Sequence, residues 1–192
     1  MSIINVVGAK IWGGGEQYVY DICKQLQQRH RTAYILVDQS NEDMQSRYAQ
    51  VGHVMTANLY TLKGFLSVNA VAKQMKEQGI NTIVCHSGKY ILFCIALKQL
   101  TGAKLVFIKH NLVPGKTDIY HRWINAQVDA FVCVSKLVYD DLMTPAIKDT
   151  SKYHVVYNGI DPNRFQSFSD DVTMKYKVRT FGYSARIKER KG

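Results

Sequence analysis

With 192 residues, 46% of them hydrophobic and 21% charged, the chain has the composition of a globular protein, long enough for one buried core or for one core and part of a second. These proportions exclude a disordered or low-complexity protein. The formal net charge of +10 suits anionic partners such as nucleotide phosphates, lipid headgroups or nucleic acid, and residues 175–192 alone hold seven basic side chains and one acid.

The first 26 residues set the architecture. Residues 3–7 form a short β-branched apolar run, a turn follows with Gly8, Gly13, Gly14 and Gly15, and apolar residues then recur with helical spacing at 19, 22, 23 and 26. This strand, glycine turn and helix are the first half of a βαβ unit. Glycines let a ligand approach the backbone, and the helix that follows directs N–H groups at the same place, so an anion or a sugar hydroxyl would bind well.

Better-known glycine motifs do not fit this turn. A P-loop would need Lys and then Ser or Thr after Gly13, and a dinucleotide fingerprint starting there would need glycine at Tyr18. On these residues alone, a ligand-binding turn and a plain glycine-rich connection are equally supported, and Glu16 would then do no more than favour the helix dipole.

Strands and helices alternate along the rest of the chain. Gly79 and Gly102 are expected to end two of the helices, and Ser135 is expected to cap the last. We predict strands at 32–37, 51–57, 82–85, 104–109, 130–134 and 154–157, helices at 65–75, 89–100, 118–126 and 136–143, and a loop or short helix at 38–47.

This alternation predicts a doubly wound α/β domain, with a mostly parallel Rossmann-like sheet covered by helices on both faces. Ligands of such sheets bind beyond the carboxyl ends of the strands. The candidate site residues are therefore those directly after strands, namely residues 8–15, His86, Ser87, His110, Asn111, Ser135, Asn158 and Gly159.

The cysteines do not indicate a metal site. No C-x-x-C pair or zinc-like Cys/His spacing occurs, so we expect buried, reduced thiols of a cytosolic protein at Cys23, Cys85, Cys94 and Cys133. No basic segment precedes a long apolar run at the start, which predicts no signal peptide. The longest apolar run, residues 90–97, is too short to span a bilayer, so any membrane contact is expected to be peripheral.

The composition of the sequence changes near residue 158, from alternating apolar segments to turn-forming and polar residues. We assign residues 1–157 to a Rossmann-like domain, 158–175 to a polar interdomain linker, and 176–192 to the first strand of a second domain. One strand cannot bury a core, so the chain is expected to be cut just inside that second domain.

Several of these motifs, taken in order, resemble one family. They are the Gly13-Gly14-Gly15-Glu16 turn, Lys109-His110 after a strand, Val134-Ser135, the segment Val156-Tyr157-Asn158-Gly159-Ile160-Asp161 with Phe165 beyond it, and Gly182-Tyr183-Ser184-Ala185-Arg186 followed by Lys191. The set resembles the N-terminal domain of the retaining GT-B glycosyltransferases of family 4. Ala185 departs from the glycine usual before the arginine, and the E-x7-E region of the nucleotide domain is missing.

The resemblance implies functional roles for individual residues. His110 would be the catalytic residue, as a hydrogen-bonding or electrostatic group, and Gly13, Gly14, Gly15, Arg186 and Lys191 would contact the donor diphosphate. Acceptor or cleft positions would be Glu16, His86, Asn111, Ser135 and Asn158. No metal or other cofactor is expected.

It also implies partners and a setting. A nucleotide-sugar donor would bind the missing domain, and a glycan or lipid-linked sugar acceptor would bind this one, with retention, in cell-surface polysaccharide synthesis. The chain alone would be inactive. It would be cytoplasmic, with a possible peripheral contact to the anionic inner face of the membrane.

Two alternatives stay open. A GT-B-fold sugar-nucleotide epimerase would share the cleft but take no acceptor. A basic α/β nucleic-acid-binding module would use the positive charge, but no known RNA- or DNA-binding motif is present and the charge gathers at the end of the chain, so we expect no nucleic acid. His121 and Trp123 are interpreted as packing or solvated residues.

Overall fold

The computed structural model describes residues 2–59, 64–143, 147 and 149–159. Met1–Asn158 form one compact unit, and a second unit begins at Gly159. The predicted linker, apart from Asn158 and Gly159, and the predicted strand at 176–192 lie outside the described residues.

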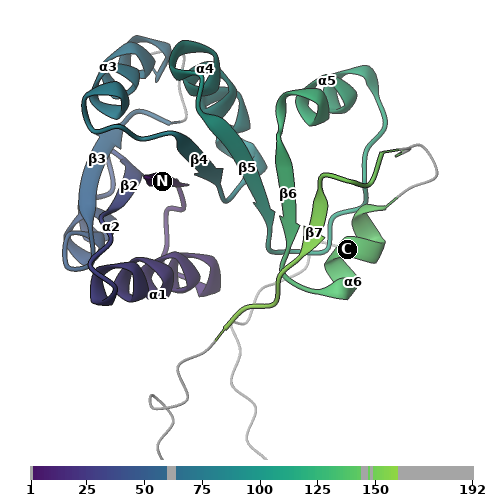
Figure 1. Ribbon diagram of the computed structural model, residues 1–192, viewed down its shortest axis with the longest axis horizontal. Coiled ribbons are helices and arrows are strands. Elements are labelled where there is room, and N and C mark those ends of the chain that lie inside the picture. Colours follow the sequence, from purple (N-terminus) through teal and green to yellow (C-terminus); the bar gives the residue numbers. More distant parts are fainter. Residues whose placement is uncertain (1, 60–63, 144–146, 148, 160–192) are drawn as a thin grey trace, which may run out of the picture. The chain divides into compact units, whose positions relative to one another are not determined.

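A seven-stranded, all-parallel sheet forms the centre of this unit (Figure 1). Its order is β3-β2-β1-β4-β5-β6-β7, and every neighbouring pair of strands is parallel. The predicted α/β fold class is therefore confirmed. The strands are β1 Ile3–Val7, β2 Ala33–Asp38, β3 His53–Ala57, β4 Thr82–Cys85, β5 Lys104–Lys109, β6 Ala130–Cys133 and β7 Tyr153–Val155.

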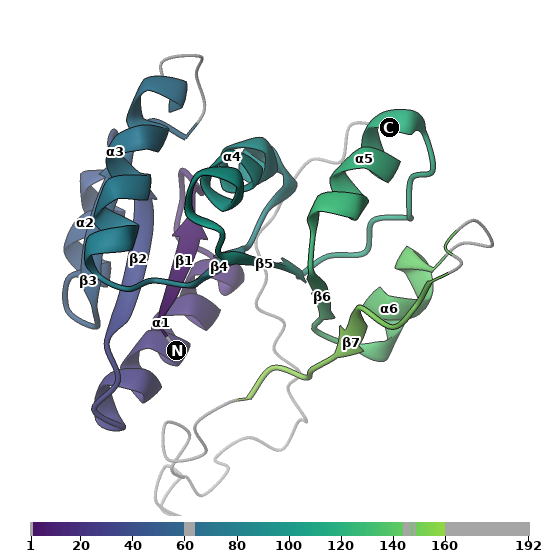
Figure 2. The same ribbon diagram turned by 45° about the horizontal axis from the view of Figure 1, so that its top comes forward.

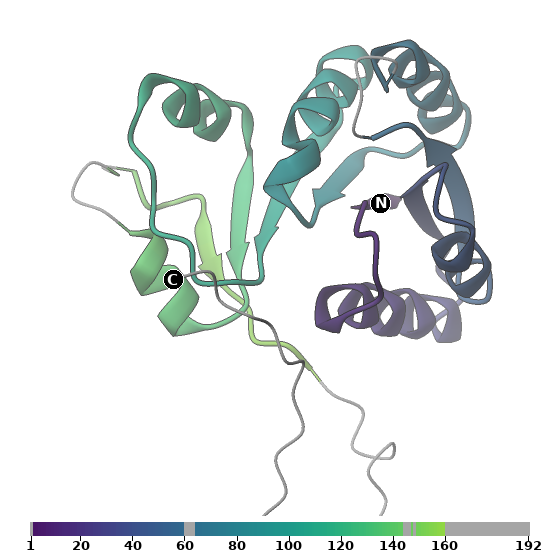
Figure 3. The same ribbon diagram turned by 180° about the vertical axis from the view of Figure 1, so that it is seen from behind.

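Helices cover both faces of the sheet. Helices α3 and α4 lie side by side on one face (Figure 2), and α1 lies on the other, with the strands between them (Figure 3). The helices are α1 Gly14–Gln28, α2 Glu42–Tyr48, α3 Gly64–Glu77, α4 Ile91–Thr101, α5 Ile119–Gln127 and α6 Lys136–Leu142, and a 3-10 turn, η1, spans Gly88–Tyr90.

Two apolar cores correspond to the two faces. The larger core joins α3, α4, α5 and α6 to the sheet and includes the fully buried Met75, Leu97 and Phe131. The smaller core joins α1 and α2 to the other face, around Val19 and Tyr48. Burying one such aliphatic or aromatic side chain contributes about 1.5–3 kcal/mol, so each helix is held mainly by its apolar face.

Local signals fix where these helices begin and end. The side chains of Asn41, Asp118 and Ser135 accept hydrogen bonds from backbone N–H groups of the first turns of α2, α5 and α6. Gly79 and Gly102, after α3 and α4, have φ angles of +62° and +72°, which side chains disfavour. The predicted cap at Ser135 and the predicted stops at Gly79 and Gly102 are thus confirmed.

The topology places the polar residues at one edge. The chain runs outward from β1 through β2 to β3 in one direction, and from β4 through β5 and β6 to β7 in the other, so the reversal lies between β1 and β4. Connections on the two sides of such a reversal leave a crevice at the carboxyl ends of the strands. Within the described ranges, no helix is long and apolar enough to cross a membrane.

Candidate functional site

A glycine turn links β1 to α1 at this edge. Gly13 is the N-cap of α1 and has no side chain to satisfy the first N–H groups of the helix. A Cβ atom built on Gly14 or Gly15 would meet no atom within 4 Å, so the space in front of the turn is open. Unsatisfied N–H groups and a positive helix end together favour an anion or a hydroxyl oxygen.

Neighbouring side chains hold the turn in place. The Trp12 indole Nε1 donates to Gln17 Oε1 at 3.2 Å, and the Arg47 guanidinium lies 5.0 Å from the centre of the Trp12 ring. Asn41 Nδ2 donates to the Ala9 carbonyl at 2.9 Å. The turn is therefore anchored to α1 and to α2.

Glu16, in the first turn of α1, is half-buried. Its backbone carbonyl accepts a hydrogen bond from the Tyr48 hydroxyl at 3.0 Å. The structure therefore gives this residue a place in the support of the turn, while its carboxylate lies where it can favour the helix dipole.

Two histidines meet beside the turn. His86 follows β4 and His110 follows β5, and His86 Nδ1 lies 3.1 Å from His110 Nε2. The other nitrogen of His86, Nε2, lies 3.1 Å from Oδ1 of Asn5. Asn5 is a buried polar residue in the middle of β1, and its Nδ2 donates to Cys23 Sγ at 3.8 Å. One hydrogen-bonded chain thus crosses α1, β1, β4 and β5.

This chain fixes the proton positions of both rings. Burial, together with the neighbouring His110, lowers the pKa of His86 to about 3, and burial also lowers the pKa of His110, so both rings are neutral at pH 7. Because Asn5 Oδ1 can only accept, His86 carries its proton on Nε2 and accepts at Nδ1. His110 must then donate from Nε2, which leaves its Nδ1 as the remaining acceptor of the pair.

Tyr18 connects the histidines to α1. Its ring packs edge-on against His110, with ring centres 5.2 Å apart, and against His86 at 6.2 Å. Such edge-to-face geometry is favourable for aromatic pairs. Because Tyr18 lies one turn into the helix that begins at the glycines, the glycine turn and the histidines belong to one region of the carboxyl edge.

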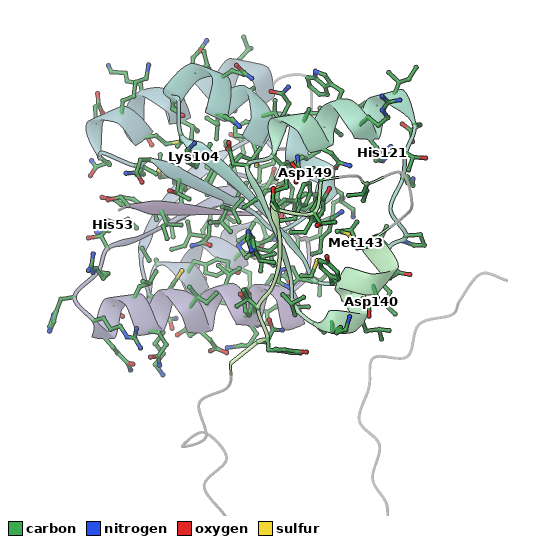
Figure 4. All side chains as sticks on the ribbon, turned by 45° about the vertical axis from the view of Figure 1, so that its right-hand side comes forward. His53, Lys104, His121, Asp140, Met143 and Asp149 are labelled. Carbon is green, nitrogen blue, oxygen red and sulfur yellow. The ribbon has the colours of Figure 1, made fainter. Side chains whose placement is uncertain are left out.

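A cavity of about 440 Å³ opens beside the histidines. Its walls come from the turn after β4, the end of β5, the segment after β5, α5, and the end of α6. His86, His110 and Asn111 line it together with Lys89, Lys109 and Lys116. In Figure 4, His121, which also lines this cavity, lies on the opposite side of the view from His53 and Lys104, which begin β3 and β5.

The predicted site residues fall into three groups. His86, His110 and Asn111 lie together, with the glycine turn and Glu16 nearby through Tyr18. Ser135 caps α6 by accepting from Val138 N at 3.2 Å, and Asn158 is exposed at the end of the unit. Arg186 and Lys191 lie outside the described residues. His121 is half-buried and pairs with Asp118 at 2.7 Å, and Trp123 is exposed.

Asn5, Tyr18 and Lys109 are parts of this region that the sequence did not single out as site residues. Asn5 carried a usable signal, since a polar side chain interrupts an otherwise apolar strand. Tyr18 carried none, because its role depends on contacts between distant segments, and Lys109 was noted only as the neighbour of His110 in the Lys109-His110 motif.

Other expectations concern cysteines and metals. All four cysteines are free and buried, which confirms the predicted thiols. Among the residues that can be described, no group of three or more His, Cys, Asp or Glu side chains is placed to hold a metal ion.

Comparison with known proteins identifies a family. The model of Glycosyltransferase Family 4 matches residues 12–164, which is most of the chain and includes the glycine turn and both histidines. No curated protein matches the sequence.

Solved structures share the fold at low sequence identity. A glycosyltransferase from Rickettsia africae ESF-5 has 19% identity and a TM-score of 0.74, over 86% of this chain and 45% of that one. HepE from Anabaena, solved with UDP-glucose, has 18% identity and a TM-score of 0.68, over 88% and 47%. A UDP-GlcNAc 2-epimerase from Neisseria meningitidis, bound to UDP-GlcNAc, has 10% and 0.58, over 82% and 47%. This chain spans less than half the length of each.

Proposed function

This chain belongs to Glycosyltransferase Family 4, and from that membership we propose that the complete protein moves a sugar from a nucleotide-sugar donor to an acceptor held by the domain described above. One observation carries the proposal: the hydrogen-bonded pair of His86 and His110 lies beside the glycine turn at the carboxyl edge of the sheet. A group that contacts the sugar and a turn that contacts its diphosphate have to be neighbours in such a reaction.

The proposed donor is a nucleotide diphosphate sugar. Its diphosphate would approach Gly13, Gly14 and Gly15, where the backbone is uncrowded and the helix end is positive. UDP-glucose, the ligand of the Anabaena neighbour, is a reasonable first donor to try. Arg186 and Lys191 would add cations to the same diphosphate.

The proposed chemistry depends on charge stabilisation. Negative charge builds on the leaving diphosphate as the glycosyl bond breaks, so fixed N–H donors and cations that face it lower the barrier. His110 would accept a hydrogen bond at Nδ1 from a hydroxyl of the donor sugar or the acceptor. We propose retention at the anomeric carbon, with the acceptor proton passing to the leaving phosphate, and no metal.

The wider setting is proposed on the same basis. The acceptor would be a glycan or lipid-linked sugar used in cell-surface polysaccharide synthesis, and this chain alone would not turn over. We propose a cytoplasmic location with a peripheral membrane contact. Helix α5 supports the contact, because Ile119 is 85% exposed and Tyr120 and Trp123 are about half exposed next to Arg122.

Binding and product analysis test the function. The complete protein should bind at least one UDP-, GDP- or ADP-sugar by calorimetry and transfer its sugar to an acceptor. Changing His110→Ala should lower kcat by about 10- to 100-fold, because a hydrogen bond to the reacting sugar is lost, whereas His154→Ala, an exposed histidine on β7, should not.

Two results would redirect this proposal. Binding of none of these nucleotide sugars would remove it. Conversion of a UDP-sugar to its epimer without an acceptor would favour the epimerase function found among the structural neighbours.

A further inference from the structure

The cavity beside the histidines has a one-sided charge. Three lysines from three successive segments line it: Lys89 in η1, Lys109 at the end of β5, and Lys116 in the segment after β5. Among the described residues that line it, none is Asp or Glu. A carboxylate-free wall with three ammonium groups attracts an anion.

Of the three lysines, Lys109 gives the strongest evidence for a bound anion. It is only part-exposed, its Nζ lies 4.4 Å from the centre of the Phe107 ring, and no carboxylate among the described residues pairs with it. Burial lowers the pKa of its ammonium group, which is the direction expected for a cation that lacks a partner. A bound anion would offset the cost of keeping this charge away from water.

Hydrogen-bond donors and apolar surface complete the wall. Ser87, Asn111 and Asn125 supply neutral polar groups, while Val113 and Tyr120 form a half-exposed apolar rim. A volume of about 440 Å³ is in the range of small-molecule sites. Since His86 and His110 line the same space, a ligand here would lie next to the proposed catalytic group.

We infer that this cavity binds the phosphate group of the acceptor, so that the acceptor of this enzyme is a phosphorylated molecule. The inference rests on the proposed function and names its acceptor class. Lysine binds phosphate as a point charge, and a phosphate carrying up to two negative charges matches several lysines better than a single carboxylate does. Such an acceptor is either a soluble sugar phosphate or a lipid phosphate whose apolar part would lie along the rim.

Calorimetry with small phosphates tests the inference on the complete protein. Hexyl phosphate, glycerol 3-phosphate and hexanol are titrated with UDP saturating the donor side, and also without UDP. Hexyl phosphate should bind and hexanol should not. The triple variant Lys89→Met, Lys109→Met, Lys116→Met should weaken hexyl phosphate binding by about tenfold or more.

Matched controls separate the site from general charge. Lys24→Met, Lys73→Met, Lys76→Met removes the same charge from exposed positions on α1 and α3 and should leave the affinity unchanged. Lys116→Met alone, at an exposed position, gives a variant whose folding is not at risk and should still weaken binding. Equal loss in both triple variants, or equal binding of hexanol and hexyl phosphate, overturns the inference.

The other outcomes are also decisive. Tighter binding of hexyl phosphate than of glycerol 3-phosphate identifies a lipid phosphate as the source, and equal binding identifies a soluble one. A protein that binds UDP-sugars but neither phosphate refutes this inference and leaves the proposed function standing. A protein that binds the phosphates through these lysines but no nucleotide sugar refutes the function instead.

Discussion

Asn5 determines the state of the two histidines, although it lies more than 80 residues from either. Its amide bridges Cys23 and His86, and its oxygen can only accept, so the proton of His86 is fixed on Nε2 and that of His110 on Nε2. Without such a partner, each ring could exchange between tautomers. A buried amide in β1 thereby leaves Nδ1 of His110 unprotonated, so that this atom is a hydrogen-bond acceptor.

The lowered pKa of His86 predicts a pH-dependent stability. Its folded value, about 3, is below the ordinary 6.5, so between these pH values the unfolded chain binds a proton that the folded chain does not. This contribution is fully present above about pH 6.5 and is lost as the pH falls toward 3, by up to about 1.4 kcal/mol per pH unit. Urea unfolding from pH 7 to 4.5 measures it.

A substitution isolates this effect. His86→Gln should flatten the pH dependence of the free energy of unfolding over that range, whereas His154→Gln, at an exposed position on β7, should leave the wild-type slope. If the His86→Gln and wild-type curves run parallel, the inference that the histidine pair is buried and neutral is wrong.

At the scale of elements, substitutions in the first turn of α1 should affect ligand binding without lowering the stability of the fold. A Cβ at Gly14 or Gly15 meets open space, so Gly14→Ala with Gly15→Ala should keep or raise the free energy of unfolding, by about 0.5–1 kcal/mol per site. The two methyl groups would occupy the space proposed for the diphosphate. The affinity of the complete protein for its nucleotide sugar should then fall on the order of tenfold, about 1.4 kcal/mol.

Gly52 provides the opposite control. A Cβ there would lie 2.5 Å from Ile35 Cδ1 and 2.6 Å from the Ala33 carbonyl oxygen, so Gly52→Ala should destabilise the fold by about 1–3 kcal/mol. Nucleotide affinity of the folded fraction should not change. Unaltered affinity in the Gly14, Gly15 variant would place the diphosphate elsewhere.

Elements were predictable where local signals agreed. The strands at 82–85 and 104–109 are found at the predicted residues, since each is a continuous apolar run that follows a glycine turn. Helix α2 remained open between loop and helix because its seven residues depend on the Asn41 cap and on burying Met44 and Tyr48. The strand ends identified His86 and His110. Their mutual contact and the cavity beside them could not be predicted, because both depend on how segments that are distant in sequence pack together.

At the scale of the whole molecule, we predict contact with anionic membranes from the net charge of +10 and the exposed surface of α5. The complete protein should co-sediment with phosphatidylcholine vesicles that contain phosphatidylglycerol, and less with pure phosphatidylcholine, and added salt should release it. Ile119→Gln with Trp123→Gln should reduce binding by about tenfold, because both side chains lose their apolar contact with the lipid.

Two other exposed apolar residues serve as the control for that surface. Leu66, on α3, is 81% exposed, and Leu137, on α6, is 64% exposed. Leu66→Gln with Leu137→Gln should not change vesicle binding. Equal loss in both double variants would mean that α5 has no special role.

The glycine stops after α3 and α4 have a practical consequence. Gly79 and Gly102 precede β4 and β5, so they lie at the amino ends of the strands, while the glycine turn, His86 and His110 follow strands at their carboxyl ends. A fluorophore or a purification handle inserted at either connection would be a full strand length away from the proposed ligand site. These two turns are therefore the places to attach probes that leave the proposed site untouched.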